Sequence, residues 1–163
     1  MKLDVPFFKQ DTLYTCGPAV VQMILRYYGI VASEHTLREK MKTNSDVGTM
    51  HKYMIDEIRA AGLYCYVNNH SSVQEIAFFL KIGLPVIVHY MEPSENSQDH
   101  YAVVVGIEDH HIILNDPWHG KDFSLTLTDF EHRWHDGKGI YHNWLLTASK
   151  EHFGVGRQYA PAA

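Results

Sequence analysis

The chain has 163 residues, a mass of 18.8 kDa, a hydrophobic content of 45% and a formal net charge of −5. This composition is typical of one folded domain with one core and argues against disorder. Lys and Arg number 14 against 19 Asp and Glu, without a basic cluster, so no nucleic-acid partner is indicated. The apolar runs are strand-sized, so no membrane span is predicted either.

The N-terminus and the cysteines indicate a compartment. Asp4 stands where a signal peptide would need an apolar stretch, so we expect a cytoplasmic protein unless the chain was trimmed. Cys16 and Cys65 are then expected to be free thiols in a reducing environment. Their spacing alone does not exclude a disulfide between them.

Four helices are predicted in the first half of the chain, after an extended segment over residues 5–15. Pro18 suits the first turn of a helix, and apolar residues follow at helical spacing up to Gly29. Three later segments each begin at a residue that can cap a helix N-terminus. The expected caps are Ser33, Thr49 and Ser72, the expected ends lie near Met41, Gly62 and Gly83, and Leu37, Met50, Ile58 and Ala77 are expected on buried faces.

The second half of the chain reads mainly as strand. A hairpin with arms at 101–107 and 112–115 is predicted around the polar turn Glu108-Asp109-His110-His111, and a centre at Glu108 and Asp109 would set His100 opposite or nearly opposite Asp116. Both arms are apolar on successive residues, so both faces of the hairpin are expected to be covered. Helices followed by antiparallel strands indicate an α+β fold. Further strands are expected at 63–67, 85–90, 123–127 and 141–148, with a short helix at 128–134.

The expected domain organisation is simple. Residues 1–163 are predicted to form a single domain, without internal repeats. The tail at 154–163 has little to bury and is expected to be frayed.

Cys16 is the first residue that could carry chemistry. It lies where a polar loop meets the first predicted helix, and a helix N-terminus stabilises the thiolate that acts as a nucleophile. Gly17 is expected to leave room for a substrate carbonyl. A buried thiol is the more frequent fate of a lone cysteine, and we assign that role to Cys65, which lies in a strand-like run.

His100 and Asp116 could supply a base and its orienting acid. His100 begins one arm of the predicted hairpin and Asp116 ends the other, so the two are expected to face each other across the ladder. A carboxylate in that position fixes the tautomer of the imidazole and stabilises its charged form. Alone, a capping aspartate and a strand-end histidine would be the simpler interpretation, but together with Cys16 they favour a catalytic set.

Gln10 could complete this set. Acyl transfer develops negative charge on a carbonyl oxygen, and fixed N–H donors must stabilise it. The loop between Gln10 and Cys16 is long enough to place the Gln10 amide beside the thiol. The alternative is an ordinary surface glutamine.

The order of these motifs resembles a known family. Gln10, Cys16-Gly17-Pro18, Gly48-Thr49, the run from Pro85, the strand from His100 and Asp116-Pro117 occur in sequence over residues 5–146. This resembles the bacteriocin-processing, double-glycine leader peptidases, a branch of the papain-like cysteine peptidases. The resemblance implies a papain-like fold of helices packed against an antiparallel sheet.

The same resemblance implies roles and partners. Cys16 would be the nucleophile, His100 the base, Asp116 the orienting acid and Gln10 the oxyanion donor, with no cofactor. The substrate would be a peptide or protein cut after small residues. Many relatives are domains of ATP-driven peptide exporters, but this sequence contains no Gly-x-x-x-x-Gly-Lys-Ser/Thr loop, so a separate transporter or delivery protein is the expected partner.

Two other functions use the same residues or fold. An acyltransferase or amidohydrolase could form the same acyl-enzyme, and a non-catalytic module could keep only the peptide groove. A metal site is a further alternative, because His132 and His135 lie three residues apart near His110, His111 and His119. The absence of a Cys-x-x-Cys or His-Glu-x-x-His pattern favours solvated histidines and no metal.

Overall fold

A computed structural model of the chain describes residues 2–154 and 156–162. Within them lie five α-helices and seven strands, the α+β composition that the sequence predicts. The helices are α1 (Cys16–Tyr27), α2 (Glu34–Lys40), α3 (His51–Ala60), α4 (Val73–Lys81) and α5 (Leu127–Arg133). The strands are β1 (Tyr64–Asn68), β2 (Val86–Met91), β3 (Asp99–Glu108), β4 (His111–Asp116), β5 (Gly120–Thr126), β6 (Leu145–Ser149) and β7 (Gln158–Tyr159).

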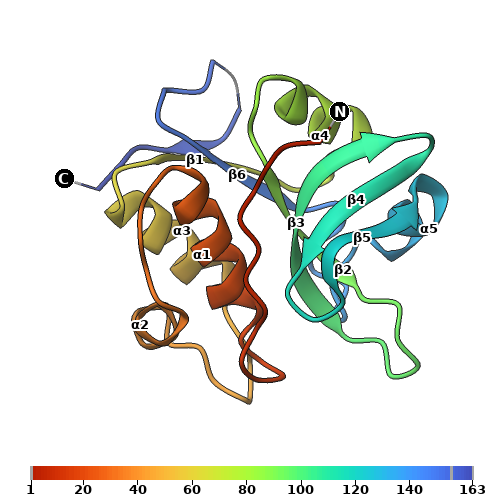
Figure 1. Ribbon diagram of the computed structural model, residues 1–163, viewed down its shortest axis with the longest axis horizontal. Coiled ribbons are helices and arrows are strands. Elements are labelled where there is room, and N and C mark those ends of the chain that lie inside the picture. Colours follow the sequence, from red (N-terminus) through yellow and green to blue (C-terminus); the bar gives the residue numbers. More distant parts are fainter. Residues whose placement is uncertain (1, 155, 163) are drawn as a thin grey trace.

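The strands form one antiparallel sheet in the order β5-β4-β3-β2-β6-β1-β7. Figure 1 shows α1, α2 and α3 together on one side of the molecule, with the curved strands β3, β4 and β5 on the other. The start of α1 and the start of β3 therefore come from two different layers. A cleft between layers can be lined by residues that are far apart in the chain.

Alternate residues of β3 enter two different cores. Tyr101, Val103 and Val105 pack with α1 and α3, whereas Ala102 and Val104 pack with α4, α5 and β4. This confirms that the hairpin is covered on both faces. It also fixes the register of β3, since a slip of one residue would exchange the two sets of side chains between the two cores.

The helix caps were predicted correctly at two positions of three. Ser33 and Ser72 accept hydrogen bonds from the backbone N–H groups of Thr36 and Glu75. Thr49 does not cap α3: Met50 holds the cap position, and Thr49 Oγ1 instead lies 2.6 Å from Thr43 Oγ1. Met50 is consequently 53% exposed rather than buried.

The burial of α4 also differs from the expectation at one residue. Ile76 and Leu80 are buried as expected, but Phe79 is buried and Ala77 is exposed. The helix is rotated because Phe79 contacts the rings of Tyr66 and Phe153. A phenyl ring buries far more apolar surface than an alanine methyl, so it determines which face turns inward.

The hairpin turn lies within the predicted segment from Glu108 to His111, but its centre is one residue later than the position that would set His100 opposite Asp116. Glu108 pairs with His111, so the turn consists of Asp109 and His110, both with positive φ. A register shift follows between Val104 and Gly106, and the recorded pairing ends at Val103 opposite Asn115. His100 therefore lies nearer the start of β3 than the residue that would be directly opposite Asp116.

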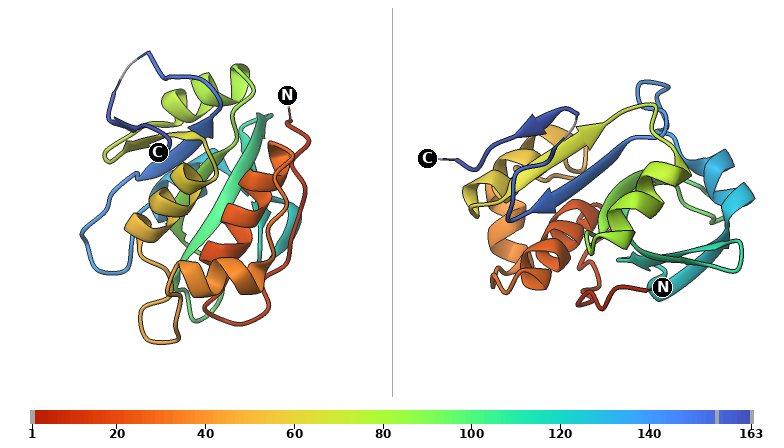
Figure 2. Two further views of the ribbon diagram at one scale, coloured as in Figure 1. Left: turned by 90° about the vertical axis from the view of Figure 1, so that its left-hand side faces the viewer. Right: turned by 90° about the horizontal axis from the view of Figure 1, so that it is seen from above.

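Part of the C-terminal tail, where fraying was expected, pairs with the sheet at Gln158 and Tyr159. Cys65 and Tyr66 of β1 pair with Tyr159 and Gln158 of β7. Figure 2 shows this dark blue segment running beside β1. The Arg59 side chain adds a hydrogen bond to the carbonyl of Ala160. Among the described residues, no helix is long and apolar enough to span a membrane.

Candidate active site

Cys16 is the first residue of α1 and is partly exposed, as a nucleophile must be. Thr15 ends the loop before the helix and is fully buried, and its Oγ1 accepts the backbone N–H of Thr12 at 3.0 Å. The loop is therefore held tightly up to the thiol. The first N–H groups of a helix have no acceptor within it, so they face a developing negative charge at this end.

Gly17 serves a different purpose from the one expected. A Cβ on this residue would lie 2.3 Å from Thr49 Oγ1, and the residue is buried. The missing side chain therefore faces the loop before α3 and leaves no special room for a substrate carbonyl. Glycine is required here so that Thr49 can pack against the first turn of α1.

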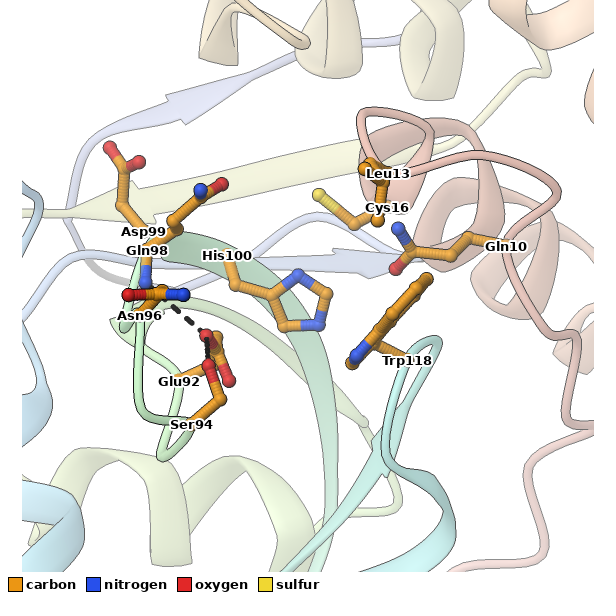
Figure 3. A pocket seen from close by; sticks show the side chains of 10 residues that line it. All are labelled: Gln10, Leu13, Cys16, Glu92, Ser94, Asn96, Gln98, Asp99, His100 and Trp118. Atoms are coloured by element: carbon orange, nitrogen blue, oxygen red, sulfur yellow. Dashed lines mark hydrogen bonds between the residues drawn. The ribbon is translucent and has the colours of Figure 1, made fainter.

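His100 and Asp116 meet in a direct hydrogen bond. His100 Nε2 lies 2.8 Å from Asp116 Oδ1, and the two residues are 6% and 0% exposed. His100 reaches the acid although the two are not directly paired across the ladder. The other ring nitrogen, Nδ1, lies on the side of Cys16 (Figure 3).

The environment of His100 favours its charged form. Burial lowers the pKa of an imidazole, but the charge and hydrogen bonding of Cys16 and Asp116 outweigh it and raise the pKa to about 10. Burial likewise acts to raise the pKa of Asp116, but hydrogen bonds from His100, Tyr90 and the backbone lower it. The position of His100 beside the sulfur of Cys16 and the carboxylate of Asp116 therefore favours the imidazolium form of its ring.

Tyr90 is a member of this network that sequence reasoning missed. It pairs with His100 across β2 and β3, and its hydroxyl donates to Asp116 Oδ2 at 2.5 Å. The backbone N–H groups of Trp118 and His119 both donate to Oδ1 at 2.9 Å. Each carboxylate oxygen is thus fixed. A polar hydroxyl within the apolar run of β2 was the available signal.

Gln10 is 5% exposed and is not a surface residue. Its Nε2 donates one hydrogen bond to the carbonyl of Thr12 at 2.7 Å, and an amide nitrogen carries a second N–H. Figure 3 shows this nitrogen turned toward Cys16. The backbone N–H of Gln10 donates to Pro117 O at 3.0 Å, which ties the loop before α1 to the turn after Asp116.

A cavity of about 310 Å³ brings the predicted residues together. Gln10, Cys16 and His100 line it, and Asp116 lies behind His100. Trp118, whose indole is exposed, forms part of the wall beside Gln10 (Figure 3). Glu92 lies on another part of the wall, where its Oε2 is 2.9 Å from His119 Nε2.

A second cavity, of about 230 Å³, also reaches Cys16. The loop before α3 and the strand residue next to His100 form much of its wall, through Gly48, Thr49 and Tyr101. Tyr101 is buried, and its hydroxyl donates to the carbonyl of Thr49 at 2.8 Å. The wall on this side of the thiol is therefore rigid.

Cys65 contrasts with Cys16. It is fully buried on β1, and burial raises the pKa of its thiol to about 12. Both cysteines are free. In the described part of the chain, no group of three or more His, Cys, Asp or Glu side chains is arranged to hold a metal.

Comparison with known proteins gives a family and a fold. The model of the Peptidase_C39 like family matches residues 2–142. An uncharacterized protein of Methanothermobacter marburgensis is 28% identical over 122 residues, which cover 72% of this chain and 75% of the relative.

Solved peptidase domains share the architecture. The peptidase domain of Streptococcus ComA, a bi-functional ABC transporter involved in quorum sensing, gives a TM-score of 0.72 at 22% identity, covering 91% of this chain and 100% of that domain. A double glycine motif protease from an AMS/PCAT transporter was solved in complex with the leader peptide. It gives a TM-score of 0.70 at 22% identity, and the match covers 90% of this chain and 93% of that protease chain. A protein from Bacillus anthracis described as a C39-like peptidase gives a TM-score of 0.73 at 17% identity, and the match covers 93% of this chain and 98% of that protein chain. The predicted papain-like α+β fold is confirmed.

Proposed function

The chain belongs to the Peptidase_C39 like family of cysteine peptidases, and we propose that it cleaves peptides after small residues, at sites of the double-glycine type. The observation that carries this proposal is the line of side chains from Cys16 through His100 to Asp116. Three residues from distant parts of the chain converge on one cavity in the order that a thiol peptidase requires.

Cys16 is the nucleophile in this proposal. Its Sγ, as the thiolate, attacks the substrate carbonyl carbon, and the π electrons move to the carbonyl oxygen. His100 then gives its proton to the leaving amine as the C–N bond breaks, which leaves a thioester on Cys16. Water attacks the thioester, His100 takes its proton, and the carboxylic acid product leaves as the thiolate re-forms.

Asp116 acts through His100. Because its Oδ1 accepts from Nε2, it keeps Nδ1 turned toward the thiol and stabilises the positive charge on the ring. It does not need to take the proton itself. Tyr90 and the N–H groups of Trp118 and His119 hold the carboxylate in this position.

Gln10 and the backbone N–H of Cys16 form the oxyanion hole. The buried Gln10 amide is held by the Thr12 carbonyl, and the Cys16 N–H belongs to the free first turn of α1. Both donors are fixed before the substrate arrives, so they lose little energy in reorganising around the tetrahedral intermediate.

Selection of small residues follows from the walls near the thiol. Tyr101 and Thr49 are joined by a hydrogen bond on one side of Cys16. Trp118 lines the cavity of about 310 Å³ on the other side of Cys16. Large side chains next to the scissile bond would clash with these groups, and a clash discriminates more strongly than a lost methylene contact. Affinity would then come from residues further along the peptide.

The natural substrate and its delivery are part of the proposal. The ComA and AMS/PCAT structures are peptidase parts of transporters, and the second is bound to a leader peptide. We infer that this chain processes a leader-like peptide in the cytoplasm, delivered by a transporter or another carrier protein.

A peptide library tests the proposal. Each residue type is placed in turn at the two positions before the cut, and wild type is compared with Cys16→Ala. We expect cleavage after Gly-Gly or Gly-Ala that the Cys16→Ala protein lacks. Equal or better cleavage after Phe, Leu or Arg would reject the small-residue specificity. No cleavage, together with no labelling of Cys16 by an electrophilic peptide, would indicate a binding module instead.

A further inference from the structure

Asp99 lies between the two cavities that meet at Cys16. Both are lined by Cys16, Leu13, Gln98 and Asp99, although their other walls differ. In Figure 3, Gln98 and Asp99 stand across the cavity from Gln10 and Trp118. Asp99 directly precedes His100 on β3, so a peptide that reaches the thiol from either side passes this carboxylate.

His89 contacts the Asp99 carboxylate, and His51 contacts His89 in turn. His89 Nε2 lies 3.5 Å from Asp99 Oδ2, and His89 Nδ1 lies 3.1 Å from His51 Nε2. His51 is stacked on Trp144 at a centroid distance of 3.7 Å, and His89 is stacked on Tyr101 at 4.5 Å. A chain of packed rings thus leads from the protein interior to Asp99.

The carboxylate is ionised and still accessible. The hydrogen bond with His89 lowers the pKa of Asp99 to about 2, against the opposing effect of burial. The backbone N–H of Gly137 adds a contact of 3.4 Å to Oδ2. Even so, 40% of the Asp99 side chain remains exposed, so a ligand can reach it.

Apart from the Cys16 and His100 pair, the carboxylates that line the two cavities outnumber the Lys and Arg side chains. Asp46 lines the smaller cavity and Glu92 the larger one. Glu92 and Asp99 are each paired with a histidine, but the Glu92 side chain is only 10% exposed whereas that of Asp99 is 40% exposed, which leaves Asp99 and Asp46 to act on a ligand. Lys138 is the single Lys or Arg among the described residues that line the two cavities. The cleft therefore suits a cationic group better than an anionic one.

We propose that Asp99 is a specificity residue, which binds the basic side chain of an Arg or Lys near the scissile bond of the peptide. His89 and His51 are its positioning residues. A fixed carboxylate beside the thiol forms charge-assisted hydrogen bonds with guanidinium or ammonium groups and repels acidic side chains. This inference rests on the proposed peptidase function and adds a charge requirement to the small residues at the cut.

The first test measures binding without cleavage. Cys16→Ala protein is titrated with fluorescent peptides that contain Gly-Gly and carry Arg, Gln or Glu at one of three positions on either side. At one position or more, we expect Arg to bind about tenfold more tightly than Gln, the scale of one charge-assisted hydrogen bond. The preference should shrink as salt is added, because the carboxylate is partly exposed. Equal binding of the Arg and Gln peptides at every position would overturn the proposal.

Variants assign the preference to Asp99. On the Cys16→Ala background, Asp99→Asn should abolish the Arg-to-Gln ratio, Asp99→Lys should reverse it in favour of Glu, and His89→Gln should reduce it. Asp56→Asn, an exposed carboxylate on α3, is the matched control and should keep the ratio. Retention of the wild-type ratio by folded Asp99→Asn and Asp99→Lys proteins would reject the assignment.

Cleavage by wild type separates this inference from the proposed function. Cleavage of all peptides at one rate, whatever their charge, would support the peptidase and reject the role of Asp99. Charge-dependent binding without any cleavage would support the role of Asp99 in binding and reject the peptidase function. The two ideas therefore fail by different results.

Discussion

Gly17 and Thr49 touch at the point where the helix of the nucleophile meets the loop before α3. A Cβ on Gly17 would lie 2.3 Å from Thr49 Oγ1 and 2.5 Å from Thr49 Cβ. Thr49 is in turn held by the Thr43 hydroxyl and, through its carbonyl, by Tyr101. The position of Cys16 therefore depends on a packing contact of the neighbouring residue, Gly17, with Thr49.

Gly17→Ala should destabilise the protein and lower its activity. Neither Thr49 nor the first turn of α1 can move without disturbing its neighbours, so we expect a loss of about 1–3 kcal/mol in the free energy of unfolding. Urea unfolding measures it. Thr49→Gly in the same protein should restore part of the activity, whereas Thr49→Ala should not, because its Cβ remains. Gly154→Ala, with nothing within 4 Å of the added Cβ, is the control. A Gly17→Ala protein with the stability and activity of wild type would show that the contact between Gly17 and Thr49 is not tight.

Cys16 should react with limiting iodoacetamide at neutral pH, and Cys65 should not. Cys16 is partly exposed at a helix N-terminus, whereas Cys65 is fully buried and the pKa of its thiol is raised to about 12. Mass spectrometry of the digested protein locates the label. Preferential labelling of Cys65 in the folded protein would show that the nucleophile was wrongly assigned.

The loss of activity at high pH should depend on Asp116. The pKa of His100 is raised from 6.5 to about 10, so the imidazolium persists through neutral pH and is lost as the pH rises toward 10. The stability that it contributes to the fold is complete below about pH 6.5 and is lost over the same alkaline range. Asp116→Asn should lower kcat and shift the alkaline limb of kcat/KM to lower pH.

The matched control for this pH profile is Asp129→Asn, on the surface of α5, which should leave the profile unchanged. If Asp116→Asn lowers activity by the same factor at every pH, the acid does not stabilise the charged His100. Its role would then be limited to holding the ring or the turn.

Gln10→Ala should lower kcat on the order of a hundredfold, the usual scale for one oxyanion donor. Because the lost hydrogen bond strengthens in the transition state, KM should change much less. Gln74→Ala, an exposed glutamine of α4, is the control. A wild-type rate for Gln10→Ala would mean that its buried amide serves only the structure of the loop.

Local chemistry explains which parts of the fold could be read from the sequence. Ser33 and Ser72 cap their helices through contacts within four residues, so a short window suffices. Thr49 has the same local signal, but its hydroxyl bonds to Thr43 and its carbonyl to Tyr101, which is 52 residues away. The docking of the tail on β1 depends on pairing across most of the chain, which composition does not reveal.

The candidate site shows the same division. Cys16, His100, Asp116 and Gln10 could be proposed because each has a distinctive residue type at the boundary of an element. Tyr90 and Asp99 could not, since a tyrosine hydroxyl in an apolar strand and an aspartate before a histidine can be matched to a partner only when the register of β2 and β3 is known. The turn from Glu108 to His111 was predicted, but its centre at Asp109 and His110 could not be fixed because several polar residues in a row could each have formed it.

The short strand β7 has a consequence for self-association. It covers the outer edge of β1 at Cys65 and Tyr66, and without it the sheet would present unpaired N–H and C=O groups to other molecules. Removal of residues 154–163 would therefore leave an open sheet edge that can template pairing between copies. Light scattering of such a truncated protein, compared with the full chain, would reveal oligomers that the C-terminal segment normally prevents.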